Sequence, residues 1–568
     1  MQRSVASWVS MRVGLLLLLL ASGGVQASAL SATTEAAIDA LFVDLTAPGS
    51  PGAAVGIYRG GRVVFAKGYG LADLESGAPI TPQTPFHVAS MSKQFAAFAI
   101  ALLAREGKVD LDADVRTYLP YFPDLGVKIT TRQLIWHTSG LRDQMTLFLL
   151  GGHDIRDVLR QDHVIEMVKR QKALDFAPGT NFKYSNTGYT LLAEIVRSVT
   201  GKTLRQFTAE RMFTPLGMKH TFFYDDVREV VPARAHSYFR EGDGPWQRYL
   251  LNLEMVGASN LITTIEDLAQ WAGNFSQPRV GDAALIEQIM RGGTLNDGTP
   301  THYGFGLFEP FIFDAPLAGR RAMGHSGSDA MFFTYFVYYP EHDVAISMLA
   351  NTPTEVAAKI NAIADLYLPP NAAPVNRVSD IIKAPPPAQL DQLVGTYLHA
   401  ANRSVTLERK GNRLVGRERY SHEVFDVVFH ADGGFEVGAR RRHYYRAVRA
   451  ANGQVEALDR VIISGAPGER FQRVTRVTSR PAELARLAGD YYSDELDITY
   501  TVAVEQGQLV ARSMRLVDPV RLTQVTANHF DSETFRPTLI AFERNASGEA
   551  TGLSMDSVGL KLRRVPHP

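Results

Sequence analysis

The 568-residue chain contains no cysteine. This absence excludes disulfide bonds, a thiolate nucleophile and any zinc or iron–sulfur site built on cysteine. A net charge is missing as well, because 59 basic side chains balance 59 acidic ones. The sequence therefore lacks the basic excess typical of proteins that bind nucleic acid or an anionic membrane surface. Covalent catalysis would need a nucleophile other than cysteine.

Long apolar runs are also scarce. A transmembrane helix needs about 20 apolar residues, and no segment after the N-terminus reaches that length. At the N-terminus, Arg3 and Arg12 precede a short leucine run, and small residues follow at Ala27 and Ala29. This pattern is typical of a secretory signal peptide rather than a membrane anchor. We expect residues 1–29 to be the signal, cleaved after Ala27 or Ala29, and the mature chain to be periplasmic or secreted with no membrane span.

Strand patterns occur at both ends of the first 370 residues, and helical patterns lie between them. Hairpins are expected around Gly60-Gly61 and over 330–351. Helical periodicity is present in 33–45, 92–106, several segments of 131–213, 264–275 and 354–366. Thr264 and Asp267 resemble a capping box at the start of one helix. These elements predict an α/β (α+β) domain over 30–370, in which sequence-distant strands form one antiparallel sheet beside a helical cluster.

The rest of the chain differs in character. Residues 368–390 carry six prolines and predict a linker, which we place at 371–388. Beyond the linker, the motif LVGTY at 393–397 recurs as LAGDY at 487–491. The repeat and its short strand-like segments predict two small, lipocalin-like antiparallel β-barrels, one at 389–476 and one at 481–568.

The segment HVASMSKQF, residues 87–95, contains a candidate nucleophile and base. On a helix, residues three apart share a face, whereas adjacent residues point about 100° apart. Lys93 is therefore predicted to lie over Ser90 and not over Ser92. A lysine among apolar neighbours can lose its proton and act as a base, and free N–H groups at a helix start favour a developing oxyanion. The alternative is that Ser90 only caps the helix and Lys93 lies in solvent.

Tyr184 and Asn186 form a Tyr-x-Asn sequence just before a predicted helix. A phenol beside a lysine can pass a proton to a leaving group. The amide of Asn186 could orient that lysine and hold a substrate carbonyl. The alternative for Asn186 is a helix cap with no role in chemistry.

A third motif begins at His325, which is followed by Gly327 and Ser328 at the start of a predicted strand. Such a strand could line a cleft, with His325 as a proton donor and the Gly327–Ser328 backbone as a substrate-binding element. His302 begins a second His-x-Gly sequence, but His325 is favoured because a glycine precedes it and a long strand follows. Ser326 nearly fits the nucleophile elbow of α/β-hydrolases, yet the last glycine of that motif is missing.

The motifs S-x-x-K, Y-x-N and H-x-G occur in this order and together resemble the signature of penicillin-binding proteins and class C β-lactamase-like serine hydrolases. Segments 134–141, 176–189 and 258–271 agree, and the resemblance covers about residues 33–368. The best-known members carry lysine where this chain has His325. A neutral imidazole suits a substrate carboxylate less well than lysine does. The His-x-Gly form is similar to D-aminopeptidases, which also have trailing β-barrels, and to several esterases of this family.

The resemblance implies a serine hydrolase that forms an acyl-enzyme on small amide or peptide substrates and needs no cofactor or metal. The catalytic residues it implies are Ser90, Lys93, Tyr184, Asn186 and His325. The oxyanion and substrate-binding groups it implies are the N–H groups of Ser90 and Ser328, together with Gly327. We expect a small-molecule or short-peptide substrate and no nucleic acid partner, and the oligomeric state stays open. Two alternatives remain: a carboxylesterase of the same family, and a penicillin- or ligand-binding receptor without turnover.

Overall fold

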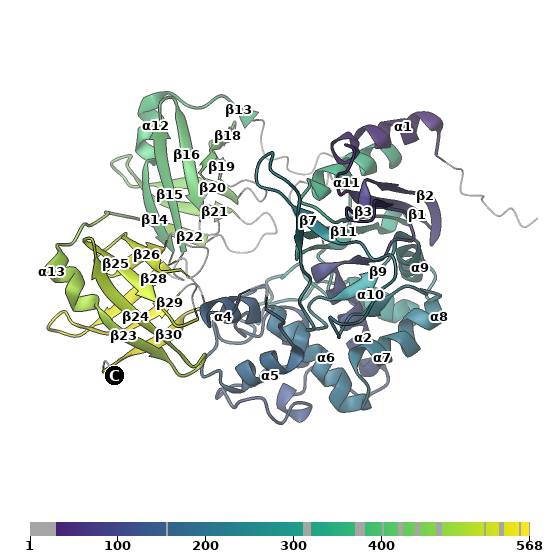
Figure 1. The fold of residues 1–568 in the computed structure, drawn as a ribbon, viewed down its shortest axis with the longest axis horizontal. Helices are drawn as coiled ribbons and strands as arrows, with labels where there is room; N and C mark the ends of the chain where they lie inside the picture. Colours follow the sequence, from purple (N-terminus) through teal and green to yellow (C-terminus); the bar gives the residue numbers. More distant parts are fainter. Residues whose placement is uncertain are drawn as a thin grey trace, which may run out of the picture.

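The computed structural model describes residues 30–154, 157–309, 320–369, 381–399, 403–418, 424–437, 443–461, 469–515, 518–532, 539–555 and 558–566. The predicted signal peptide at 1–29 and most of the predicted linker at 371–388 lie outside these residues. In Figure 1 the first domain occupies one side of the molecule, and two all-β units occupy the other.

The first domain is built on a five-stranded antiparallel sheet in the order β10-β11-β12-β1-β2. The strands are β1 (Ala53–Arg59), β2 (Arg62–Tyr69), β10 (Met323–Asp329), β11 (Phe332–Tyr339) and β12 (Val344–Ala350). Strand β1 pairs with β12, so the two ends of the domain meet in the centre of the sheet. This confirms the predicted sheet of sequence-distant strands. Short strands make smaller sheets: β3 (Leu71–Asp73) with β4 (Ala78–Pro79), β5 (Phe86–His87) and β6 (Phe222–Phe223) with β9 (Leu261–Thr263), and β7 (Ser237–Phe239) with β8 (Gln247–Tyr249).

Helices cover both faces of this sheet and form a separate cluster beside it (Figure 1). Helices α1 (Ala32–Ala40) and α11 (Val356–Tyr367) cover one face, and α9 (Ile265–Ser276) covers the other. The remaining helices are α2 (Lys93–Arg105), α3 (Thr131–Ile135), α4 (Gln144–Leu150), α5 (Gln161–Lys169), α6 (Asn186–Thr200), α7 (Leu204–Thr208), α8 (Thr214–Leu216) and α10 (Ala283–Met290).

Strand β1 is buried on both faces, as expected for an inner strand of a sheet that is covered on both sides. Successive side chains of a strand point to opposite faces. Val55 and Ile57 accordingly pack in the core under α1 and α11, whereas Ala54 and Tyr58 pack in the core under α9. The glycine pair between β1 and β2 has positive φ at both positions, +56° at Gly60 and +73° at Gly61. Such a pair suits a tight hairpin turn, and the hairpin predicted there is confirmed.

The helices differ from the prediction in three details, two at a boundary and one at a cap. The helix expected over 33–45 ends at Ala40, and a 3-10 turn covers Val43–Leu45. A 3-10 turn at Ala89–Ser92 also precedes α2, so Ser90 lies just before the α-helix instead of starting it. At α9, Thr264 Oγ1 accepts a hydrogen bond from the Asp267 N–H (3.1 Å), but the Asp267 carboxylate accepts from the backbone of His220 (2.7 Å). Only the Thr264 half of the predicted capping box is therefore present.

The last part of the chain forms two antiparallel β-sheet units, and the closed barrel predicted for each is present in the second. The second unit is a closed barrel of eight strands: β23 (Gly489–Ser493), β24 (Ile498–Glu505), β25 (Gln508–Arg512), β26 (Val520–Gln524), β27 (His529–Ser532), β28 (Leu539–Arg544), β29 (Ala550–Met555) and β30 (Leu560–Val565). Short helix α13 (Pro481–Leu484) precedes it.

The first unit is one ten-stranded antiparallel sheet. Its elements are α12 (Pro387–Leu393), β13 (Ile381–Ile382), β14 (Gly395–His399), β15 (Arg403–Lys410), β16 (Arg413–Glu418), β17 (Phe425–Asp426), β18 (Val428–His430), β19 (Phe435–Val437), β20 (His443–Arg449), β21 (Val455–Val461) and β22 (Glu469–Val474). Edge strand β17 and strand β18, which is second from the opposite edge, are separated in sequence only by Val427, and β16 contacts β19. The two ends of the sheet therefore lie close together.

The sequence repeat corresponds to a repeated contact. Tyr397 donates a hydrogen bond to the carbonyl of Leu393 (2.8 Å), and Tyr491 donates in the same way to Leu487 (2.6 Å). Each tyrosine thus closes the turn that leads into its own strand, β14 in the first unit and β23 in the second.

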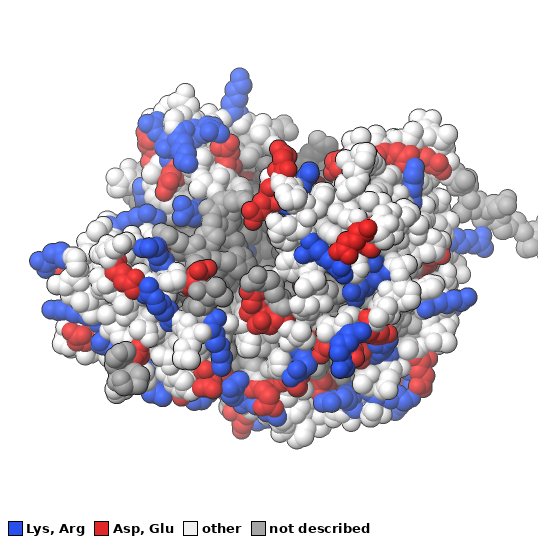
Figure 2. Space-filling view, viewed as in Figure 1, with Lys and Arg blue, Asp and Glu red and all other residues white. Residues whose placement is uncertain are grey.

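The surface in Figure 2 shows basic and acidic side chains interspersed on the face in view, in keeping with the balanced charge of the chain. Within the described ranges, no helix is both long enough and apolar enough to cross a membrane.

Candidate active site

The turn that carries Ser90 is tightly constrained. Ala89 has a positive φ of +50°, which is uncommon for a residue with a side chain and is often found at functional sites. Ser92 is fully buried: its hydroxyl donates to the carbonyl of Ala89 (2.6 Å) and accepts from the N–H of Leu261 (2.9 Å). Ser90 is only half-buried. Ser92 therefore holds the turn together, and Ser90 is the serine that a substrate can reach.

Lys93 lies over Ser90, as the helical spacing predicted. Its Nζ atom is 3.2 Å from Ser90 Oγ, 2.8 Å from Asn186 Oδ1 and 2.7 Å from the carbonyl oxygen of Ala258. The side chain is completely buried. Burial lowers the pKa of Lys93 from 10.5 to about 7, although the negative charges of Asp143 and Asp329 act in the opposite direction.

This geometry determines where the lone pair of a neutral Lys93 points. A neutral amine has two N–H groups and one lone pair. The Asn186 and Ala258 oxygens can only accept, so they take the two N–H groups. The lone pair is then left for the third neighbour, the hydroxyl of Ser90. In this state the Ser90 O–H donates to Lys93, which is the arrangement a general base requires.

Asn186 is held by an acidic residue that no sequence motif indicated. Asp143 Oδ2 accepts hydrogen bonds from the Asn186 backbone N–H (2.7 Å) and from its side-chain Nδ2 (2.8 Å). This fixes the amide so that its oxygen faces Lys93. Asp143 is also the N-cap of α4, where its other oxygen accepts from the N–H groups of Met145 and Thr146, each at 3.1 Å. In the sequence, Asp143 is recognisable only as a helix cap.

Tyr184 lies against Lys93 and against a buried histidine. Lys93 Nζ is 4.8 Å from the centre of the Tyr184 ring, and the His137 ring is 4.3 Å from it, centre to centre. His137 Nδ1 accepts a hydrogen bond from the N–H of Ser185 (3.1 Å), and its carbonyl accepts from Lys183 (2.9 Å). Burial, together with the charge of Lys93, keeps the pKa of His137 well below its usual value. His137 thus supports the loop that carries Tyr184.

Strand β10 brings the third motif beside the Ser90 turn. A Cβ atom at Gly327 would overlap the carbonyl oxygen of Val88 and the hydroxyl of Thr334. Thr334 Oγ1 also donates to the Val88 carbonyl (2.8 Å). Only glycine therefore allows β10 to approach the Val88–Ala89 backbone this closely. Ser328 follows on the same strand and is exposed.

His325 is buried and has partners at both ring nitrogens. Its Nδ1 lies 2.5 Å from the carbonyl oxygen of Ser326, so Nδ1 carries the proton and donates. Its Nε2 lies 3.1 Å from the Tyr303 hydroxyl, so the two groups form a hydrogen bond. Burial raises the pKa of Tyr303 well above its usual value, so this phenol stays protonated. Tyr303 is a second residue of the site that no sequence motif indicated.

All five predicted catalytic residues are thus in one place, on elements far apart in the sequence. Residues 38–368 match the beta-lactamase family, a span of more than half the chain.

The chain belongs to the beta-lactamase family.

Two relatives with similar sequences are named D-aminopeptidases. The chain is 30% identical over 284 residues to a D-aminopeptidase of Brucella canis; this alignment covers 49% of the chain and 52% of that protein, so the match spans about half the length of the relative. A D-aminopeptidase of Brucella anthropi is 25% identical over 527 residues, covering 89% of this chain and 93% of that protein. Among solved structures, the octameric penicillin-binding protein homologue from Pyrococcus abyssi has a TM-score of 0.53 at 21% identity, covering 78% of this chain and 99% of that one.

A second glycine, Gly306, allows close packing at the site. A Cβ atom at Gly306, whose φ is +76°, would overlap the backbone of Lys93 and Gln94. The segment that follows Tyr303 therefore rests directly on the first turn of α2. No sequence motif pointed to Gly306, because the contact joins segments more than 200 residues apart.

Proposed function

We propose that the protein is an exported serine hydrolase, periplasmic or secreted, that acts on small amide or peptide substrates as D-aminopeptidases do. The observation that carries the proposal is the set of contacts that Lys93 Nζ makes with Ser90, Asn186 and Ala258. In its neutral form Lys93 directs its lone pair at Ser90, because the Asn186 and Ala258 oxygens take its two N–H groups. The N-terminal pattern supports export.

In the proposed reaction, Ser90 Oγ attacks the substrate carbonyl carbon while its proton passes to Lys93. The backbone N–H groups of Ser90 and Ser328 bind the resulting oxyanion. Tyr184 protonates the leaving amine and is reprotonated from Lys93, so that the C–N bond breaks and an ester to Ser90 remains. Water then hydrolyses this ester, giving a carboxylic acid and free Ser90. No step uses a cofactor or a metal.

His325 fits a positioning role better than that of a proton donor. Both of its ring nitrogens are engaged, with Ser326 and with Tyr303. Its ring centre is 6.1 Å from that of Tyr184. We infer that His325 supports the aromatic wall beside Tyr184, which leaves Tyr184 as the group that protonates the leaving amine.

The charges around the site favour a substrate with a free amino group. This chain has His325 where other members of the family carry a lysine, and a histidine suits a substrate carboxylate less well than a lysine does. Asp329, one residue beyond Ser328, is partly exposed and accepts a hydrogen bond from Ser259 (2.9 Å). A carboxylate in that place attracts an ammonium group and repels a carboxylate. The names of the Brucella relatives point in the same direction.

The test compares three outcomes. A D-alanyl anilide and a short-chain aryl ester are incubated with the wild-type chain and with Ser90→Ala. Anilide turnover that requires Ser90 supports the proposal. Ester turnover without anilide turnover identifies a carboxylesterase of the same family. Stoichiometric labelling of Ser90 without turnover identifies a receptor, and either of these two results replaces the proposed activity.

A further inference from the structure

Helix α4 ends against the second barrel. Tyr500 Oη donates a hydrogen bond to the carbonyl of Leu150 (2.7 Å), and Arg515 Nη1 donates to the carbonyl of Gly151 (3.4 Å). The last carbonyl groups of a helix have no partner within the helix, and a cation at that end is favourable for the helix dipole. The barrel therefore supplies the C-terminal cap of a helix that belongs to the catalytic domain.

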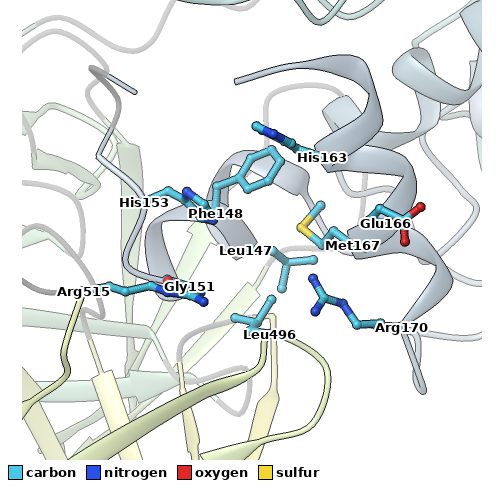
Figure 3. Close-up of a pocket in the computed structure, with 10 residues that line it drawn as sticks. All are labelled: Leu147, Phe148, Gly151, His153, His163, Glu166, Met167, Arg170, Leu496 and Arg515. Carbon is cyan, nitrogen blue, oxygen red and sulfur yellow. Dashed lines mark hydrogen bonds between the residues drawn. The ribbon is translucent and has the colours of Figure 1, made fainter. Parts of the chain in front are cut away.

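Apolar contacts accompany these polar ones. Figure 3 shows a pocket at this junction, in which Leu147 and Phe148 of α4 lie near Leu496 and Arg515 of the barrel. The apolar core of the helical cluster continues into the barrel interior as one cluster of buried side chains. The barrel is thus packed against the catalytic domain rather than merely tethered to it.

The N-terminal side of α4 is held by the same barrel. Arg142 precedes the helix and is buried, with a side chain only 4% exposed. Its Nη1 donates to Glu495 Oε2 (2.5 Å), and its Nη2 donates to the carbonyl of Gly559 (3.3 Å). Glu495 Oε2 also accepts from the backbone N–H of Lys172 (3.0 Å). Removing one partner of a buried, hydrogen-bonded ion pair is strongly unfavourable, because the other charge stays buried.

Asp143, the residue after Arg142, connects this anchor to the candidate base. Its carboxylate holds both the backbone and the side chain of Asn186. Asn186 Oδ1 in turn accepts from Lys93 Nζ. A continuous series of contacts therefore runs from Glu495 in the barrel to Lys93 beside Ser90.

We propose that the second barrel is a positioning element of the catalytic site: by binding both ends of α4 it fixes Asp143, and through Asn186 it sets the position of Lys93. Glu495 and Tyr500 are positioning residues in this proposal, because neither contacts Ser90 or Lys93 in the described part of the chain. The consequence for catalysis rests on the function proposed above, whereas the consequence for Lys93 does not.

Two substitutions in the full-length chain test the proposal, each with a matched control in the same barrel. Glu495→Gln removes the buried charge, and Asp494→Asn makes the same change at the adjacent, exposed residue, which pairs with Lys172 (3.6 Å) and Arg563 (3.5 Å). Tyr500→Phe removes the hydroxyl that caps α4. Its control is Tyr492→Phe, which removes a hydroxyl that donates to Asp497 within the barrel (2.8 Å).

We expect Glu495→Gln and Tyr500→Phe to lower kcat on the order of tenfold with little change in KM. Both variants should displace Lys93 through Asp143 and Asn186, and Lys93 acts in the chemical step. Asp494→Asn and Tyr492→Phe should retain the wild-type kcat. Tyr500→Phe changes no charge, so it separates a displacement of α4 from a direct electrostatic effect. It also keeps the proposal testable if Glu495→Gln fails to fold.

A second measurement does not depend on activity. The Lys93 amine is titrated by NMR in protein labelled with 13Cε-lysine, and Lys93→Met identifies its signal. The groups that face this amine are the carboxylates Asp143 and Asp329, the rings of Tyr184 and Tyr189, and His137. Asp143 raises the pKa of Lys93, so loosening Asp143 should move the titration to lower pH by roughly one pH unit in Glu495→Gln and Tyr500→Phe.

The two readouts separate this proposal from the proposed function. A shifted Lys93 titration in a chain that hydrolyses nothing supports the positioning role and refutes the hydrolase. Variants that titrate and turn over as their controls do overturn the positioning role. A lower kcat with an unchanged Lys93 titration also overturns it, because the barrel would then act on another part of the site.

Discussion

The amine of Lys93 lies 3.2 Å from the hydroxyl of Ser90, one helical turn earlier in the chain. Burial lowers the pKa of this amine to about 7, so its neutral form is well populated near neutral pH. In that form, two fixed oxygen acceptors leave only its lone pair for the serine. The pairing depends on Asp143, which orients Asn186. Lys93 can thus act as a general base because burial lowers its pKa and its neighbours leave its lone pair for Ser90.

The two serines of the 87–95 segment should behave differently when replaced. Ser90→Ala removes the proposed nucleophile and should lower kcat by about 10⁴-fold or more. Ser92→Ala removes a buried hydroxyl with two hydrogen bonds and should lower the free energy of unfolding by about 1–3 kcal/mol, with activity retained in the folded fraction. Kinetic assays and denaturant titrations of both variants measure these effects. Equal loss of kcat in the two variants would show that Ser90 has no special role.

The rate should depend on the protonation of Lys93. Below its pKa of about 7, Lys93 is protonated and has no lone pair for Ser90. We expect kcat/KM to fall about tenfold per pH unit below that value and to reach a plateau above it, until another group titrates. A pH–rate profile of the wild-type chain measures this. A rate that stays constant from about pH 5 to about pH 8 would contradict a neutral lysine base.

Gly327→Ala should damage the site from the neighbouring strand. The added methyl group would overlap the Val88 carbonyl and the Thr334 hydroxyl, so β10 or the Ser90 turn must move. We expect a loss of about 1–3 kcal/mol in the free energy of unfolding and a lower kcat. Gly244→Ala, at an exposed glycine near only the Glu241 carbonyl (3.0 Å), is the control. A fully active, stable Gly327→Ala variant would show that β10 does not need this close approach.

Asp329→Asn should affect substrates with a free amino group selectively. If its carboxylate binds the substrate ammonium, KM for a D-alanyl anilide should rise roughly tenfold. KM for the N-acetylated anilide, which lacks the ammonium, should not rise. Steady-state kinetics on the two substrates make the comparison. The same change in KM for both substrates would assign Asp329 a structural role, through its contact with Ser259.

Local features were predictable because they depend on neighbouring residues. The spacing of Ser90 and Lys93 on a helical turn placed the two side chains together, and the glycine pair at 60–61 marked a hairpin. The start of α2 was predicted to within one residue, but the 3-10 turn that carries Ser90 and the positive φ of Ala89 were not indicated by any local pattern.

Contacts between distant segments could not be predicted from one sequence. Asp143 has the local pattern of a helix cap, and its role with Asn186 requires two segments to meet in space. Arg142 and Glu495 are 353 residues apart. Tyr303 was visible only as part of the rejected His302 motif, yet it binds His325. Such pairings follow from tertiary packing and not from periodicity or composition.

The central claim is that Ser90 forms a covalent acyl-enzyme, and intact-protein mass spectrometry tests it most directly. The wild-type chain is mixed with an excess of a D-alanyl aryl ester, quenched in acid within the first turnovers, and mapped by peptide digestion. The account predicts one added acyl group per chain, located on Ser90 and absent from Ser90→Ala. An acyl group on another residue, such as Ser326, or rapid turnover by Ser90→Ala, would contradict it.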